Sequence, residues 1–170
     1  GNQFGDSTTD VSLAGADMTF AITQTGSNND IAAVIKGATY TGSWTFTGDY
    51  NTVDLLCSSS ATGDCDTVTL NITTTGDSNT FDFDIGETAD ASNSSVSFTV
   101  TGDNNVIAST IDGKSAAVSV TLDNSASLAT TSANSDEGNN IDIDIAGDGD
   151  TVGHTVTLDI TGGGSTYTIN

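Results

Sequence analysis

The sequence repeats a short acidic motif whose side chains could bind a metal ion. Its three best copies read TGDYNT, TGDSNT and TGDNNV, and a second acidic stretch reads NNIDIDIAGDGDT. Proteins bind Ca²⁺ through carboxylate and carbonyl oxygens, and aspartates that recur on stacked turns of a chain would supply them. The candidate ligands are Asp49, Asp77, Asp103, Asp148 and Asp150. The alternative is an acidic face in contact with solvent, so Ca²⁺ is a candidate cofactor and none is required.

The same motif carries a glycine and an asparagine at fixed positions. With the glycine at position zero, an asparagine stands at +3 and an apolar residue follows at +5. Identical asparagines stacked about 4.8 Å apart form ladders of amide hydrogen bonds, which is a structural use of the motif. The predicted corner and ladder residues are Gly26, Asn29, Gly48, Asn51, Gly76, Asn79, Gly102, Asn105 and Gly147.

Apolar residues alternate with polar ones on both sides of these corners. Before Gly76, for example, Leu70 and Ile72 are separated by a polar residue, and Phe81 stands at +5 after it. Alternation with a period of two indicates a strand on each side of a turn. The first four corners fall 11 residues apart, at Gly15, Gly26, Gly37 and Gly48.

Alternate corners resemble each other more than neighbouring corners do, and this favours a coil over a meander of hairpins. Two corners per turn predict an all-β fold, a flattened β-solenoid with two strands and about 22 residues per coil. Roughly six coils, at about 4.8 Å per stacked strand, would make a body about 30 Å long. We expect residues 1–10 to form a polar arm and residues 11–170 a single solenoid domain with open ends.

The first copy of the motif resembles the curlin repeat, in which Gln-x-Gly-x-x-Asn-x-Ala follows an alternating apolar strand. The matching stretch runs from Gln24 through Gly26 and Asn29 to Ile31, and later copies keep the glycine and the asparagine. Curlin-family proteins are secreted bacterial subunits that stack two-strand coils into surface fibres. The resemblance therefore implies a secreted subunit that assembles with itself.

Composition excludes several classes of partner. Two Lys and Arg residues stand against 23 Asp and Glu, and the formal net charge is −21. Nucleic-acid binding requires basic side chains that displace counterions, so we expect no nucleic-acid partner. No apolar run is long enough for a transmembrane helix. Motifs of nucleophilic, phosphate-binding or metalloprotease sites are missing, and the one histidine, His154, falls on the inward alternation, so we expect a packed histidine and no enzyme.

Two cysteines and the first residue bear on where the protein works. Cys57 and Cys65 lie eight residues apart in a polar stretch, and a small disulfide loop is their simplest use. A disulfide implies an oxidising compartment. The sequence begins at Gly1, which is consistent with removal of a signal segment. We therefore expect a secreted protein, in the extracellular space or at the cell surface.

The ends of the predicted solenoid suggest what the protein does. Unpaired strand edges can pair with another chain unless a cap, a charge or a proline blocks them, and neither end shows such a block. We expect a structural subunit that assembles end to end into an extracellular filament, with surface or matrix contacts as further partners. The predicted joint residues are Val11, Leu13, Tyr167 and Ile169. Insertion of the N-terminal arm into the neighbouring subunit is the alternative joint.

Other functions remain open from the sequence. Pairs of outward threonines, such as Thr73 and Thr75, recur on four coils and are similar to the ice-binding faces of some β-solenoid antifreeze proteins. A monomeric calcium-dependent adhesin or an ice-binding module is therefore the alternative to a filament. A viral fibre shaft is a further alternative.

Overall fold

The computed structural model of the protein describes most of the chain. The described residues are 1, 3–5, 11–57, 65, 67–86, 93–112, 115–123, 138–146, 153–161 and 165–170. All regular structure within these residues is β-strand. No helix among them is long and apolar enough to cross a membrane.

The strands follow each other along the chain in two alternating sets. The first set is β1 (Gln3–Phe4), β2 (Val11–Ala14), β4 (Asp30–Lys36), β6 (Thr52–Cys57), β8 (Thr80–Ile85), β10 (Val106–Asp112), β12 (Asn140–Ala146) and β14 (Thr166–Ile169). The second set is β3 (Asp17–Thr25), β5 (Thr39–Thr47), β7 (Thr67–Thr75), β9 (Asn93–Thr101), β11 (Ala116–Asp123) and β13 (Thr155–Thr161).

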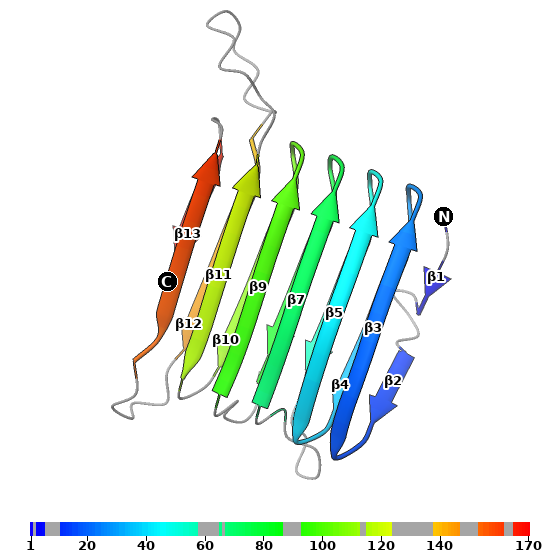
Figure 1. Ribbon diagram of the computed structural model, residues 1–170, viewed down its shortest axis with the longest axis vertical. Coiled ribbons are helices and arrows are strands. Elements are labelled where there is room, and N and C mark those ends of the chain that lie inside the picture. The colour runs from blue at the N-terminus through cyan, green and yellow to red at the C-terminus, as the bar shows by residue number, and fades with distance from the viewer. Residues whose placement is uncertain are drawn as a thin grey trace, which may run out of the picture.

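Each set forms one parallel sheet, and the chain passes from one sheet to the other at every corner. Within the described residues, sheet 1 runs in the order β1-β4-β6-β8-β10-β12-β14, with β2 beside β1 on the edge of β4, and sheet 2 runs β3-β5-β7-β9-β11-β13. The two sheets stack face to face, and the chain ends lie at opposite ends of the stack (Figure 1). This is the predicted flattened β-solenoid.

The number of coils is slightly smaller than the sequence predicted. About five turns of the solenoid lead along sheet 2 from β3 to β13, compared with the roughly six coils expected. The difference arises at the first corner, Gly15, because the strand before it is split into the short β1 and β2 and does not complete a coil.

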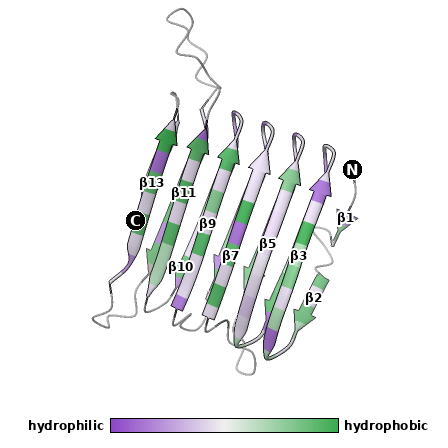
Figure 2. Ribbon diagram, in the orientation of Figure 1, coloured by the Kyte–Doolittle hydropathy of each residue, from purple (hydrophilic) through white to green (hydrophobic). Residues whose placement is uncertain are grey.

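The core lies between the sheets and is built from register columns. A column is a row of residues that pair with one another from strand to strand. One column joins Ile22 to Trp44, Ile72, Phe98, Val120 and Leu158. Its four inner members are at most 1% exposed, whereas Ile22 and Leu158 at its ends are only partly buried. Figure 2 shows apolar and polar residues alternating along the strands, and each inner apolar side chain contributes about 1.5–3 kcal/mol by burial.

Two sequence predictions about segments are resolved by the fold. The disulfide between Cys57 and Cys65 is confirmed, and it links the end of β6 to the start of the next coil. The N-terminal arm is not wholly outside the solenoid, because Gln3 and Phe4 pair with Asp30 and Ile31 of β4. The boundary at residue 10 is therefore wrong for these two residues, since Phe4 packs against the core.

Candidate functional site: the corner ladders and the two open ends

The TGxxN corners share one backbone conformation. Their glycines have positive φ values, between 114° at Gly26 and 134° at Gly76. The residue at +2 is also left-handed in each copy, with φ near 58° at Tyr50 and 57° at Asn104. L-residues avoid these conformations, which explains the glycine, whereas the second left-handed position was not predicted from the sequence. Asparagine fills it in two of the four copies, and that was the available signal.

The stacking of coils is a second reason why these positions require glycine. A β-carbon on Gly48, Gly76 or Gly102 would lie within 2.5 Å of the carbonyl oxygen of the glycine one coil away. A β-carbon on Gly26 would meet only the Asn29 amide, at 4.0 Å. No backbone atom therefore blocks a β-carbon at Gly26, although Gly1 lies against Asn28 of the same corner.

Every backbone N–H of the second corner has a partner on a neighbouring coil. Gly48 N and Tyr50 N donate to the carbonyls of Thr75 and Asp77. Asp49 N donates to Oγ of Ser27, and Asn51 N donates to Oδ1 of Asn79. The motif therefore supplies side-chain acceptors for the two corner N–H groups that have no carbonyl partner.

The predicted asparagine ladder is present and is longer than expected. Asn29, Asn51 and Asn79 each donate through Nδ2 to Oδ1 of the next asparagine, at 2.8–2.9 Å. These side chains are at most 3% exposed. The backbone N–H of Asn105 continues the ladder to Oδ1 of Asn139, which the sequence analysis did not place there.

The prediction that Gly147 is a corner equivalent to the TGxxN corners is wrong, because the strand before it belongs to the other sheet. The apolar residues before Gly147 form β12, which belongs to sheet 1, whereas the TGxxN corners follow strands of sheet 2. The asparagine position of that coil is Asn139, just before β12. Gly147, Asp148 and Asp150 lie outside the described residues. The signal that could have found Asn139 is the sequence Asn139-Asn140-Ile141, which matches Asn29-Asp30-Ile31 in type and spacing.

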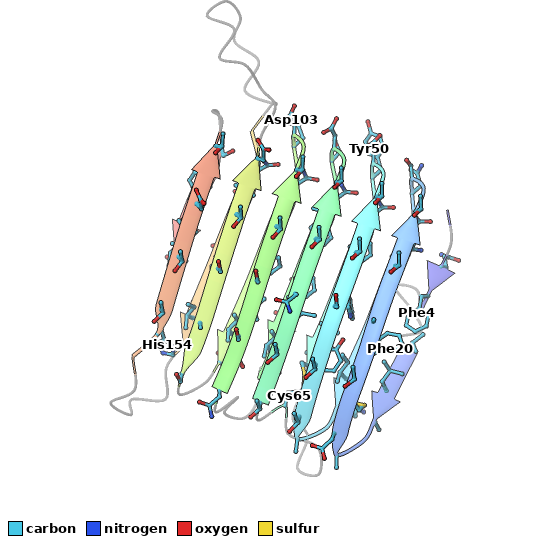
Figure 3. The ribbon with its side chains drawn as sticks, viewed as in Figure 1. Phe4, Phe20, Tyr50, Cys65, Asp103 and His154 are labelled. Carbon is cyan, nitrogen blue, oxygen red and sulfur yellow. A yellow bond between two sulfur atoms is a disulfide. The ribbon has the colours of Figure 1, made fainter. Side chains whose placement is uncertain are left out.

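The predicted aspartate column is in register, and its side chains bind the backbone. Asp77 N donates to Oδ1 of Asp49 at 2.9 Å, and Asp103 N donates to Oδ1 of Asp77 at 2.8 Å. Figure 3 shows Asp103 and Tyr50 at the same edge of the solenoid. Among the described residues, no three His, Cys, Asp or Glu side chains form a group that could hold a metal ion. The carboxylates of Asp49 and Asp77 thus accept hydrogen bonds from corner N–H groups, and Ca²⁺ binding by Asp49, Asp77 and Asp103 stays a prediction.

His154 is not the packed core residue that its inward position predicted. It is exposed beside the start of β13, and its Nδ1 accepts a hydrogen bond from the backbone N–H of Ala116 (Figure 3). The inward alternation of β13 begins at Val156, after His154.

Sheet 1 carries much of the acidic charge on its outer face. Asp54 pairs in register with Asp82, and Asp84 follows two residues later on the same strand. Partial burial raises the pKa of Asp82, and the neighbouring Asp84 charge raises it further. Like charges on adjacent positions of a sheet repel each other, and salt weakens this repulsion.

The N-terminal end leaves part of the core uncovered. Among the described strands β3 has a partner on one side only, and its inward residues Met18, Phe20 and Ile22 are only partly buried. A cavity of about 350 Å³ opens beside β3, lined by Phe4, Ala21, Ile22, Thr23, Gln24 and Ile31. Oε1 of Gln24 is buried and has no hydrogen-bond partner among the described residues. Within the described chain, this end is a strand edge with apolar side chains beside it.

The C-terminal end is open in the same way. β13 pairs only with β11 and β14 pairs only with β12 within the described residues. Leu158 and Tyr167 pack against the core but are partly exposed, and Ile160 and Ile169 are 36% and 46% exposed. The four predicted joint residues therefore lie on the outermost strands of sheet 1, Val11 and Leu13 on β2 at one end and Tyr167 and Ile169 on β14 at the other.

The outer face of sheet 2 presents threonines in straight rows. One row joins Thr23, Thr45, Thr73, Thr99 and Thr121 in register, and it ends at Asp159. A second row joins Thr25, Thr47, Thr75 and Thr101 and ends in Asp123 and Thr161.

The chain matches no family model, no curated protein and no solved structure.

Proposed function

We propose that this protein is the structural subunit of an extracellular filament and that its copies stack end to end, with β13 of one copy beside β3 of the next. The observation that carries the proposal is the pair of open ends. Within the described chain, the strand at each end of each sheet has one edge without a partner, and the apolar columns continue to these edges without a covering element.

The two ends fit each other in chemistry as well as in direction. All strands are parallel, so a second copy adds to the stack without a change of direction. Leu158 and Ile22 are the two ends of one apolar column, and Val156 and Phe20 are the two ends of another. Stacking of two copies would therefore place Leu158 of one copy beside Ile22 of the next, and Val156 beside Phe20. The contact between β13 of one copy and β3 of the next joins two different surfaces of identical copies. It can therefore be repeated from copy to copy and builds an open filament.

The acidic surface and the disulfide suit this role. A formal charge of −21 would keep filaments apart along their sides, because both the corner column and sheet 1 are lined with aspartates. The disulfide agrees with assembly outside the cell, in an oxidising environment. The resemblance to curlin repeats suggests the same kind of assembly. The chain itself is thus the partner that we propose.

Negative-stain electron microscopy of the purified chain, with and without a calcium chelator, tests the proposal. We expect long unbranched fibres in both conditions, because the joint consists of backbone pairing and apolar contact. Single small particles at high concentration and in salt would overturn it. Loss of fibres only with chelator would give Ca²⁺ a part in assembly.

A pair of variants on one strand separates assembly from folding. Leu158→Lys places a charge on the inward face of β13, where the joint would bury it, so we expect the subunit to fold but not to assemble. Thr157→Lys places the same charge on the outward, exposed face of the same strand, and we expect fibres to persist. Equal assembly by both variants would show that β13 is not at the joint.

The threonine rows favour a second candidate function, the binding of ice. Threonines of one row stand about 4.8 Å apart, and those on one strand at i and i+2 about 6.6 Å apart, which is a regular two-dimensional array. A thermal-hysteresis measurement tests this candidate. Activity that is lost with Thr73→Lys on sheet 2 and kept with Thr80→Lys on sheet 1 would support it.

A further inference from the structure

We propose that the joint between copies involves the replacement of one strand by another: β14 of one copy takes the place beside β4 that β1 occupies in the next copy. The inference rests on the proposed function, because it specifies how two copies meet.

The register shows that β1 and β14 are equivalent strands. Phe4 pairs with Ile31, and Tyr167 pairs with Ile141. Ile31 and Ile141 are joined through Val53, Phe81 and Ile107 of the intervening strands. Phe4 and Tyr167 therefore stand in one column at opposite ends of sheet 1. Tyr167 can place an aromatic ring where Phe4 now stacks on Phe20, with ring centroids 5.8 Å apart.

The two sheets have unequal numbers of strand positions along the stack. Among the described residues, sheet 2 has six, whereas sheet 1 has seven because β1 and β2 share one position on the edge of β4. If whole copies were stacked without change, β14 would abut β1 and β2, and sheet 2 would lack one strand at every joint. The cavity beside β3 would then stay open.

Replacement of β1 removes this mismatch. With β14 in the position of β1, both sheets repeat after six strands, and β13 lies directly against β3. The later part of β2 can stay in place, because Leu13 and Ala14 pair with Ile35 and Lys36, beyond the residues of β4 that β14 would face. Ile169 and Val11 share a column and would both face Ala33, so β14 must also displace the start of β2, and pairing would pass from β14 to the rest of β2 beyond that point.

The exchange also increases backbone pairing. β14 pairs through four residues, Thr166 to Ile169, whereas it displaces three, Gln3 and Phe4 of β1 and Val11 of β2. The short β1 would thus protect the edge of a free subunit and yield to the longer β14 during assembly.

The axial rise per subunit in the filament, measured by cryo-electron microscopy, tests the exchange directly. Six strand positions give a rise of about 29 Å, and seven positions give about 34 Å. A rise near 29 Å with β14 paired to β4 is the expected result. Filaments with a rise near 34 Å would overturn the exchange and leave the proposed function standing, whereas an absence of filaments would overturn both.

A variant of β1 provides a kinetic test. Phe4→Ala removes the stacking on Phe20 and should raise the fraction of subunits with β1 released by about fivefold or more, so that filaments appear sooner. Gln3→Ala, at an exposed position of the same strand, should leave the lag unchanged. Slower assembly of the Phe4→Ala variant, with an unchanged circular dichroism spectrum, would show that β1 is part of the joint and would overturn the exchange.

Discussion

The side-chain amide of Asn51 donates to Oδ1 of Asn79 across 2.9 Å, and the backbone N–H of Asn51 donates to the same oxygen at the same distance. One side chain thus satisfies two donors of the neighbouring coil. Asn79 itself is fully buried, so water cannot take its place. The ladder is therefore the part of the corner on which the stacking of coils depends most.

Asn79→Ala should lower the free energy of unfolding by about 2–4 kcal/mol, because it leaves two buried donors of Asn51 without an acceptor. Asn71→Ala, at an exposed position on β7, should change it by less than about 0.5 kcal/mol. Chemical denaturation of the monomeric chain measures both. Equal effects of the two variants would contradict a structural role for the ladder.

The Asn79→Asp variant separates the loss of a donor from the loss of volume. The carboxylate keeps the acceptor for Asn51, but an oxygen replaces the group that donates to Asn105. Burial and the facing oxygen should raise the pKa of the new carboxyl group, so the stability of this variant should increase as the pH falls. A pH-independent difference from the unchanged protein would argue against this geometry.

Two glycines with similar backbone conformation should differ in their response to substitution. Gly26→Ala imposes only the strain of a positive φ, which costs about 1–3 kcal/mol. Gly76→Ala adds a β-carbon 2.4 Å from the Gly48 carbonyl oxygen, and should cost clearly more. Thermal unfolding of the two variants gives the comparison. Similar losses would mean that the coils can separate locally to admit a methyl group.

The alternation of apolar residues and the recurrence of TGxxN were enough to predict a two-sheet solenoid and the first four members of the ladder. Both signals are local, because each strand and corner carries its own pattern of residue types. The disulfide was predictable for the same reason, from two cysteines in one short loop. These features did not require knowledge of how distant segments pair.

Sequence reasoning failed where position depends on pairing between coils. Asn139 joins the ladder although no TGxxN motif stands before it, because the register of β12 with β10 places it there. The role of Asp49 and Asp77 as acceptors was missed because the sequence does not show which corner N–H groups lack carbonyl partners. Phe4 was assigned to an arm because two residues are too short to show alternation.

Tyr50→Asn should stabilise the protein. Tyr50 has a left-handed backbone at the +2 position of its corner, and its side chain is 63% exposed, so the ring gains little from packing. Asparagine adopts this conformation at lower cost and already fills the same position at Asn28 and Asn104. We expect a gain of about 0.5–1 kcal/mol in the free energy of unfolding. A loss of stability would indicate that the ring makes a contact that supports the corner.

Tyr40 should make the fold sensitive to alkaline pH. Its hydroxyl oxygen accepts a 2.8 Å hydrogen bond from Nε1 of Trp44, and the side chain is fully buried. Burial raises the pKa of Tyr40 to about 12 from an ordinary value of 10.0, although the Trp44 hydrogen bond acts in the opposite direction. Between these two values the unfolded chain releases the proton while the folded chain retains it, so the free energy of unfolding falls as the pH rises.

The loss should be about 1.4 kcal/mol between pH 8 and pH 11. Tyr40→Phe should remove this dependence, while lowering stability at pH 8 by about 1–2 kcal/mol because Trp44 loses its acceptor. Urea unfolding of both proteins at the two pH values separates the two effects. If the variant loses as much stability as the unchanged protein between pH 8 and pH 11, the alkaline sensitivity arises from groups other than Tyr40.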